Sequence, residues 1–142
     1  MKQEFLMLAD GAEATNGKIF ILGGGADRHA SASFEPAAAL RADIACSVLV
    51  DWGEANRTFA VTLKIVDEDE RTAAVLEFTM ETGRPPGAKP GQQLRTLLAV
   101  RGPFRIPHPG GYRLAMELNG APQDPPFHFW VDQVAGPQGA PR

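Results

Sequence analysis

The clearest pattern in the chain is a two-residue alternation of apolar and polar side chains between residues 40 and 66. In the first run the apolar residues occupy the even positions: Leu40, Ala42, Ile44, Cys46, Val48, Val50 and Trp52. After residues 53–56 they occupy the odd positions: Phe59, Val61, Leu63 and Ile65. Because successive side chains of a β-strand point to opposite faces, each run predicts a strand with one buried face. The short break between the runs predicts a central antiparallel hairpin, with Val61 and Ile65 facing the even side of the first strand.

Similar runs predict further strands at residues 5–8, 18–22, 74–80, 94–100, 112–118 and 127–131. Asn16-Gly17 predicts a hairpin turn, since a type I′ turn needs positive φ at both central residues. The strand at 18–22 is apolar at nearly every position, which predicts a central strand covered on both sides or a strand beneath a loop. Residues 29–36 leave a helical turn and an edge segment as alternatives.

About eight strands without a helical pattern indicate an all-β domain. The proline- and glycine-rich approach to the strand that begins at Tyr112 resembles the penultimate strand of immunoglobulin-like sandwiches. We therefore expect an antiparallel β-sandwich, immunoglobulin-like or C2-like, in preference to a closed barrel. Residues 1–134 are predicted to form one domain, and residues 135–142 a disordered tail.

Charge and composition narrow the possible partners. The 142 residues carry a net charge of −3 without a long block of like charge, so neither nucleic acid nor an anionic membrane surface is expected as a partner. No run approaches the ~20 apolar residues of a membrane span, and the N-terminal apolar run is too short for a signal peptide. Cys46 is the only cysteine and occupies one of the apolar, core-facing positions of its predicted strand, so we expect its small side chain to be buried. A cytoplasmic protein is expected.

The sequence lacks the common motifs of nucleotide-binding loops, zinc sites and serine hydrolases. Residues 23–25 form a glycine cluster after a strand, but neither GxGxxG nor GK[ST] occurs and no helical pattern follows. The three histidines, His29, His108 and His128, lack the close spacing of zinc ligands, and no GxSxG elbow is present. The chain is therefore expected to be neither an enzyme nor the carrier of a cofactor.

If successive strands alternate in direction, the loops at 52–56, 82–93 and 119–126 lie at one end of the domain. The loops at 67–71 and 101–111 then lie at the other end, ~30 Å away, because a strand rises ~3.3 Å per residue. The first end gathers a candidate binding surface: Trp52, Glu54, Asn56, Arg84, Lys89 and Asp124. Two interpretations compete, a recognition surface and a simple cap over the core; the core parity of Trp52 favours the cap.

The acidic turn at residues 67–70 supports an alternative function. Asp67 and Asp69 could be calcium ligands, since C2-type sandwiches gather aspartates from several loops. The loop at 101–111, expected at the same end of the domain as this turn, offers Arg105 and His108 but no carboxylate. A solvated turn, with a salt link to a nearby arginine, is the competing interpretation.

Trp130 completes the candidate binding surface. Phe127 and Phe129 share the core parity of the last strand, which leaves Trp130 on the opposite face. Its cover would be the loop at residues 24–36 or a second copy of the protein. The sequence thus allows a homodimer formed through Trp130 or through an exposed edge strand, for which the weakly charged segment 5–8 is a candidate.

Several segments in a fixed order resemble an uncharacterised bacterial domain family. They are MLADGA at 7–12, GKIFILGGG at 17–25, WGEANR at 52–57, VDED at 66–69, GRPPG at 83–87 and GY at 111–112. The resemblance implies one all-β domain and no assigned activity. The function that we expect from the sequence is a non-catalytic protein-binding or assembly module with an unknown partner. The alternative is a calcium- or ligand-binding C2-like domain that uses the acidic turn.

Overall fold

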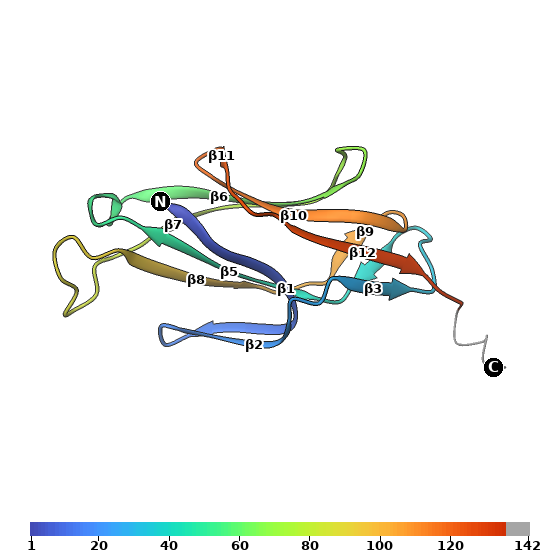
Figure 1. Cartoon of the computed structure of the whole chain (residues 1–142), viewed down its shortest axis with the longest axis horizontal. Helices are drawn as coiled ribbons and strands as arrows, with labels where there is room; N and C mark the ends of the chain where they lie inside the picture. The colour runs from blue at the N-terminus through green and yellow to red at the C-terminus, as the bar shows by residue number, and fades with distance from the viewer. Residues whose placement is uncertain (136–142) are drawn as a thin grey trace.

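The computed structural model describes residues 1–135, which form β-strands joined by turns and loops (Figure 1). The only helical element among these residues is one 3₁₀ turn, Trp52–Glu54. The strands are β1 (Lys2–Thr15), β2 (Lys18–Gly24), β3 (Arg28–Ser31), β4 (Ala38–Leu40), β5 (Asp43–Val50), β6 (Thr58–Asp67), β7 (Thr72–Glu81), β8 (Leu94–Val100), β9 (Phe104–Ile106), β10 (Gly110–Leu118), β11 (Ala121–Pro122) and β12 (Phe127–Gln133). The prediction of an all-β domain is confirmed.

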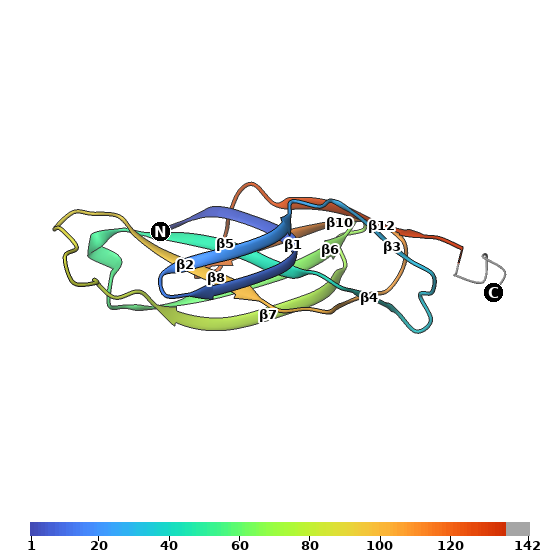
Figure 2. The same cartoon turned by 90° about the horizontal axis from the view of Figure 1, so that it is seen from below.

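Two sheets face each other across one core. Sheet A has the order β2-β1-β5-β8, and sheet B has the order β3-β12-β10-β6-β7, with β11 added to β10. A separate two-stranded pair lies beside them and consists of β4, labelled in Figure 2, and β9, labelled in Figure 1. Within residues 1–135 the strand pairs are antiparallel except β3 and β12, which run parallel. The predicted antiparallel sandwich is therefore confirmed, with one parallel pair at the edge of sheet B.

The alternation in the sequence correctly predicts which side chains enter the core. Ile44, Cys46, Val48 and Val50 on β5 are fully buried. On β6, Val61 and Ile65 are buried to the same degree, and these two strands contribute to the same hydrophobic cluster. A β-strand with one buried face needs this period whatever its neighbours are. On β5, however, Ala45 and Ser47 of the opposite parity are fully buried as well, so both faces of this strand are covered.

The predicted central hairpin is wrong. β5 pairs with β1 and β8 in sheet A, whereas β6 pairs with β7 and β10 in sheet B. The 3₁₀ turn that follows Asp51 carries the chain from one sheet to the other, and Ala55, which directly follows the turn, is buried. Two strands that face each other across a sandwich have the same apolar period as two strands paired within one sheet. The pattern alone could not separate these arrangements.

Three predicted segments differ in detail. The long first strand is interrupted at residues 41–42, which separate β4 from β5. The loop predicted at 101–111 contains β9, which pairs with β4. Of the two alternatives for residues 29–36, the edge segment is confirmed in part, since β3 lies beside β12. Together with the two-residue β11, these short additions raise the number of strands from about eight to twelve.

β2 is the largest departure from the sequence prediction. The sequence predicts a strand that is covered on both sides or lies beneath a loop, but β2 lies at the edge of sheet A. Figure 1 shows it along the lower margin of the molecule with no element beyond it. Phe20 is 56% exposed and Leu22 is 73% exposed. The segment 5–8, a candidate edge in the sequence, pairs with β5 along one side, whereas the pairing of β1 with β2 begins only at Ala9.

β1 pairs with different strands along its two halves. Residues Lys2 to Ala9 pair with β5, and residues Ala9 to Thr15 pair with β2. In both views the second half turns back with β2 as a hairpin over the outer side of sheet A (Figures 1 and 2). The predicted turn at Asn16-Gly17 is confirmed, with φ of 53° and 72°, the positive pair that a type I′ turn requires.

Tyr112 links the start of β10 to the preceding loop. Its hydroxyl donates a hydrogen bond of 2.5 Å to the carbonyl of His108, four residues upstream. Immunoglobulin-like sandwiches commonly use a tyrosine at this place for the same contact. This feature favours the immunoglobulin-like over the C2-like alternative, although the subtype stays a prediction.

The predicted tail, residues 135–142, lies outside the described residues except for Ala135. Within residues 1–135, no helix is long and apolar enough to cross a membrane.

The core assignment predicts the effect of shortening Ile44, whose side chain is fully buried. Ile44→Ala should lower the free energy of unfolding by ~2–5 kcal/mol, because it removes buried apolar surface and leaves a cavity. Val75→Ala is the matched control, since Val75 is 51% exposed, and its effect should stay within ~0.5 kcal/mol. Urea unfolding measures both values. A loss below ~1 kcal/mol for Ile44→Ala would contradict the core assignment.

Candidate functional site

The end of the domain that carries Trp52 is held together by its own polar contacts. The Arg84 guanidinium lies 4.3 Å from the centre of the indole ring of Trp52, and it donates a 2.6 Å hydrogen bond to the carbonyl of the same residue. The side chain of Gln93 donates to Asp51 at 3.3 Å. The loops at 52–56 and 82–93 are therefore neighbours, as strand alternation predicts.

Two further residues of the predicted binding surface also have partners at this end. The Glu54 carboxylate accepts hydrogen bonds from the amino group of Met1, at 2.6 Å, and from the backbone N–H of Asp51, at 3.2 Å. The contact with the amino group lowers the pKa of Glu54. The backbone N–H of Asn56 donates to Thr82 at 2.8 Å. These contacts fit the interpretation of this end as a cap, and its role as a binding surface stays a prediction.

The structure does not gather all the predicted residues at one place. Lys89 is exposed in the 82–93 loop. Asp124 lines a shallow hollow on the outer side of sheet B, beside Lys64 and Arg113. Trp130 lies in sheet B near the acidic turn, since it pairs with Gly111 while the adjacent residue of β10 pairs with Asp67. The predicted residues therefore divide between the Trp52 end of the domain and sheet B, where the hollows beside Asp124 and Trp130 share Val66 and Arg113.

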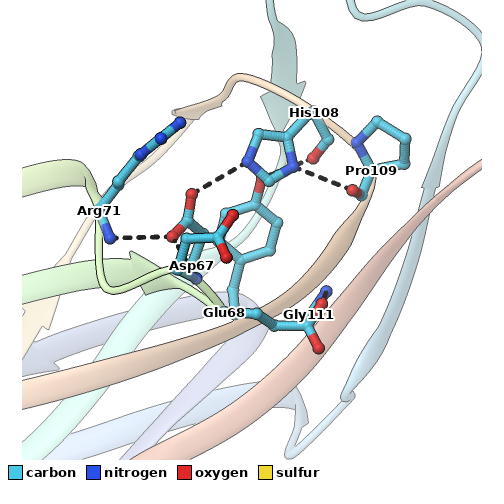
Figure 3. Close-up of polar contacts among 8 residues, drawn as sticks. Asp67, Glu68, Arg71, His108, Pro109 and Gly111 are labelled. Carbon is cyan, nitrogen blue, oxygen red and sulfur yellow. Dashed lines mark hydrogen bonds and ion pairs between the residues drawn. The ribbon is translucent and has the colours of Figure 1, made fainter.

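The acidic turn is organised by the carboxylate of Asp67 (Figure 3). One carboxylate oxygen accepts hydrogen bonds from the backbone N–H groups of Asp69 and Arg71, both at 2.9 Å. The other oxygen lies 3.0 Å from Nε2 of His108. The residue is 4% exposed, and the backbone donor of Arg71 is the main reason that the pKa of Asp67 is lowered. The carboxylate thus closes the turn and joins it to the loop before β10.

His108 is held between two hydrogen-bond acceptors. Its Nδ1 lies 3.0 Å from the carbonyl of Pro109, and its Nε2 faces the Asp67 carboxylate (Figure 3). Only the protonated imidazole can donate to both at once. The hydrogen bond to Pro109, followed by the one to Asp67, raises the pKa of His108 above 6.5. An imidazole fixed in this way has no free nitrogen to accept a proton from a nucleophile.

This arrangement gives no support to the calcium alternative. Both oxygens of Asp67 already accept hydrogen bonds, and Asp69 lies at the exposed side of the turn. Calcium needs six to eight oxygen ligands. Among residues 1–135, no group of three or more histidine, cysteine or acidic side chains is placed to hold a metal ion.

Trp130 borders an open hollow of about 320 Å³ on sheet B. The hollow is also lined by Glu68, whose carboxylate accepts a 3.0 Å hydrogen bond from the backbone N–H of Gly111. Arg28 lies 5.3 Å from the centre of the indole ring and pairs with Asp132. Trp130 nevertheless remains 40% exposed. The loop at 24–36 therefore covers it only in part.

The β1–β2 hairpin is the surface that the sequence analysis missed. Among the described residues, six large apolar side chains are at least about a third exposed, and three of them are consecutive: Phe20, Ile21 and Leu22. The signal was present in the sequence, since this strand is apolar at both parities directly after an Asn-Gly turn. Such a pattern fits a doubly covered strand and an uncovered edge equally well. In the structure this strand, β2, lies at the uncovered edge of sheet A.

These surfaces define a small β-sandwich domain whose polar clusters have internal partners and whose hairpin exposes apolar side chains. The chain belongs to a family of unknown function (DUF6941), whose model matches residues 4–126. This confirms the expected membership of an uncharacterised domain family. No curated protein matches the chain.

The pair of Asp67 and His108 predicts how stability depends on pH. The folded-state pKa of His108 lies above 6.5, so its contribution to the free energy of unfolding is full below pH 6.5. That contribution is lost as the pH rises through the folded-state pKa. The stability of the wild-type protein, relative to that of His108→Gln, which does not titrate, should therefore decline as the pH rises above 6.5. Urea unfolding at a series of pH values measures this.

An NMR titration of the imidazole supplies the matched control. Asp67→Asn should lower the pKa of His108, because it removes the charged acceptor, whereas Asp69→Asn should change it less. A wild-type imidazole pKa at or below 6.5 would contradict the described geometry.

Proposed function

We propose that the protein is a non-catalytic binding module that attaches to another polypeptide through the β1–β2 hairpin. The observation that carries this proposal is the exposure of three consecutive apolar side chains on an edge strand: Phe20 at 56%, Ile21 at 36% and Leu22 at 73%. Exposed apolar side chains gathered on one element commonly mark interaction sites. The edge of a sheet also offers backbone groups with which an extended segment can pair.

The two other candidate surfaces give weaker support. Arg84 already stacks on the ring of Trp52, so a partner would have to displace it to reach the indole. Asp67 and His108 hold each other in fixed contacts, which favours a structural role for this pair over proton transfer. The hairpin, in contrast, has apolar side chains and a strand edge available together. This combination suits the recognition of an extended polypeptide.

A site-specific cross-linking experiment tests the proposal. Benzoylphenylalanine replaces Phe20 in one variant and Val75 in another, the latter being an equally exposed residue on β7. After illumination in cells that naturally contain the protein, position 20 should yield polypeptide adducts and position 75 should not. Mass spectrometry identifies each adduct.

The control for specificity acts on the backbone. Ile21→Pro removes one N–H group from β2, and an edge strand tolerates proline where that group faces solvent. It should abolish the adduct at position 20, because strand pairing requires the group. Equal adducts at positions 20 and 75, or adducts unaffected by Ile21→Pro, would contradict the proposal.

The calcium alternative makes the opposite prediction about thermal stability. A calcium site with the affinity of extracellular modules would be occupied at several millimolar calcium and would raise Tm. Since the Asp67 carboxylate is engaged within the turn, we expect no change in Tm. Differential scanning calorimetry with and without calcium measures this. A rise in Tm that Asp67→Asn abolishes would favour the calcium alternative.

A further inference from the structure

The free edge of β2 can be specified at the level of individual backbone groups. Asn16 and Gly17 form a two-residue turn, so the flanking residues Thr15 and Lys18 begin the series of hydrogen-bonded pairs. Every second residue of β2 then bonds to β1. The N–H and C=O groups of Ile19 and Ile21 consequently point away from β1.

An independent contact supports this assignment. Ala12 is the residue of β1 opposite Ile21, and its backbone N–H donates to the carboxylate of Asp43 at 3.1 Å. That group therefore points away from β2. In an antiparallel pair, opposite residues either both turn their backbone groups inward or both turn them outward. The N–H and C=O of Ile21 accordingly face outward.

β2 has few of the features by which proteins protect an edge strand. Such strands usually contain proline, a bulge or inward-pointing charges. Residues 18–22 contain no proline, their pairing with β1 is regular, and Lys18 is the only charged residue. Phe20 and Leu22 lie on the exposed face of the hairpin, whereas the side chain of Ile21 lies near Met7 of sheet A, since both border Gly24. The edge is thus free in its backbone and apolar on its outer face.

We propose that the polypeptide bound at this edge is a second copy of the protein, and that two β2 strands pair antiparallel about a two-fold axis at Phe20. This inference rests on the proposed function and names its partner. The two hairpins would then form one continuous four-stranded sheet with the order β1-β2-β2-β1.

Hydrogen bonding selects this register. With the axis at Phe20, Ile19 of each copy lies opposite Ile21 of the other, so the outward N–H and C=O groups of both residues are paired. An axis at Ile21 would instead pair Ile19 with Gly23, whose φ of +62° lies outside the strand region. An axis at Ile19 would bring Gly17, in the turn, opposite Ile21. Only the axis at Phe20 uses regular strand residues throughout.

The side chains fit the same register. Phe20 lies directly opposite Phe20 of the second copy, and cross-strand aromatic pairs are favourable in sheets. Lys18 lies opposite Leu22 of the second copy, so no like charges meet, and the aliphatic part of the lysine can cover the leucine. The contact is isologous, which closes the assembly at two copies.

The size of the contact predicts its strength. One strand pair with its side chains buries less surface than the ~1,600 Å² of a standard stable interface. The dimer should therefore depend on concentration, with a dissociation constant in the micromolar to millimolar range.

Sedimentation velocity from about 5 to about 500 μM tests the dimer in the full chain. Phe20→Lys and Phe20→Glu should each raise the dissociation constant at least tenfold, because each places like charges opposite one another. An equimolar mixture of the two variants should dimerise again, since opposite charges then meet. Val75→Lys, on the exposed face of β7, should leave the dissociation constant unchanged.

Disulfide trapping tests the register. In Phe20→Cys the two introduced thiols would lie on the two-fold axis, within the Cα separation that a disulfide needs. In Leu22→Cys they would lie four residues apart along the strands, roughly 13 Å. Under oxidation Phe20→Cys should form a covalent dimer and Leu22→Cys should not. The native Cys46 is buried and does not interfere.

The outcomes separate this inference from the proposed function. Monomers at every concentration, together with a position-20 adduct to a different protein, would overturn the dimer and leave the proposed function standing. Monomers with no adduct at position 20 would overturn both. A dimer that survives Phe20→Lys, or equal trapping at positions 20 and 22, would overturn the proposed register.

Discussion

The Asp43 carboxylate joins two segments at the point where β1 exchanges β5 for β2 as its partner. One oxygen accepts the backbone N–H of Ala12 in the hairpin, and the other accepts the backbone N–H of Gly102 in the link from β8 to β9, both at 3.1 Å. A side chain at position 102 would collide with the carbonyl of Ala42, so only glycine allows this approach. These contacts supply partners for backbone groups that the sheet no longer pairs. They fix where β1 passes from β5 to β2, and hence where β2 is exposed.

The acidic turn at the end of β6, in sheet B, uses the same kind of device for a different purpose. Asp67 closes the turn after β6, His108 connects that turn to the following loop, and Tyr112 anchors the loop to β10. Each of these three side chains has a hydrogen-bond partner within the domain. Such an arrangement stabilises loops, but it leaves little capacity for an outside ligand. The hairpin differs because its free groups belong to the backbone of a strand and have no such partner within the regular pairing.

The sequence predicted the buried faces but not the neighbours of each strand. The parity of Ile44 and Val61 followed from the two-residue period, which depends only on one face meeting a core. The pairing of β5 with β1 depends on contacts about forty residues apart, and no local pattern records them. Phe20 and Leu22 were misassigned for a related reason. Apolar side chains on both faces of a strand indicate burial in most sheets, and the edge position of β2 follows only from the complete strand order.

Amide hydrogen exchange of β2 tests most directly the claim that this strand is a free edge. The pairing pattern predicts that, in dilute protein, the amides of Ile19 and Ile21 exchange rapidly while those of Phe20 and Leu22, bonded to β1, are protected. NMR resolves the four amides individually. Equal protection of all four would show that β2 is covered on both sides, and it would contradict the account of the hairpin as the binding surface.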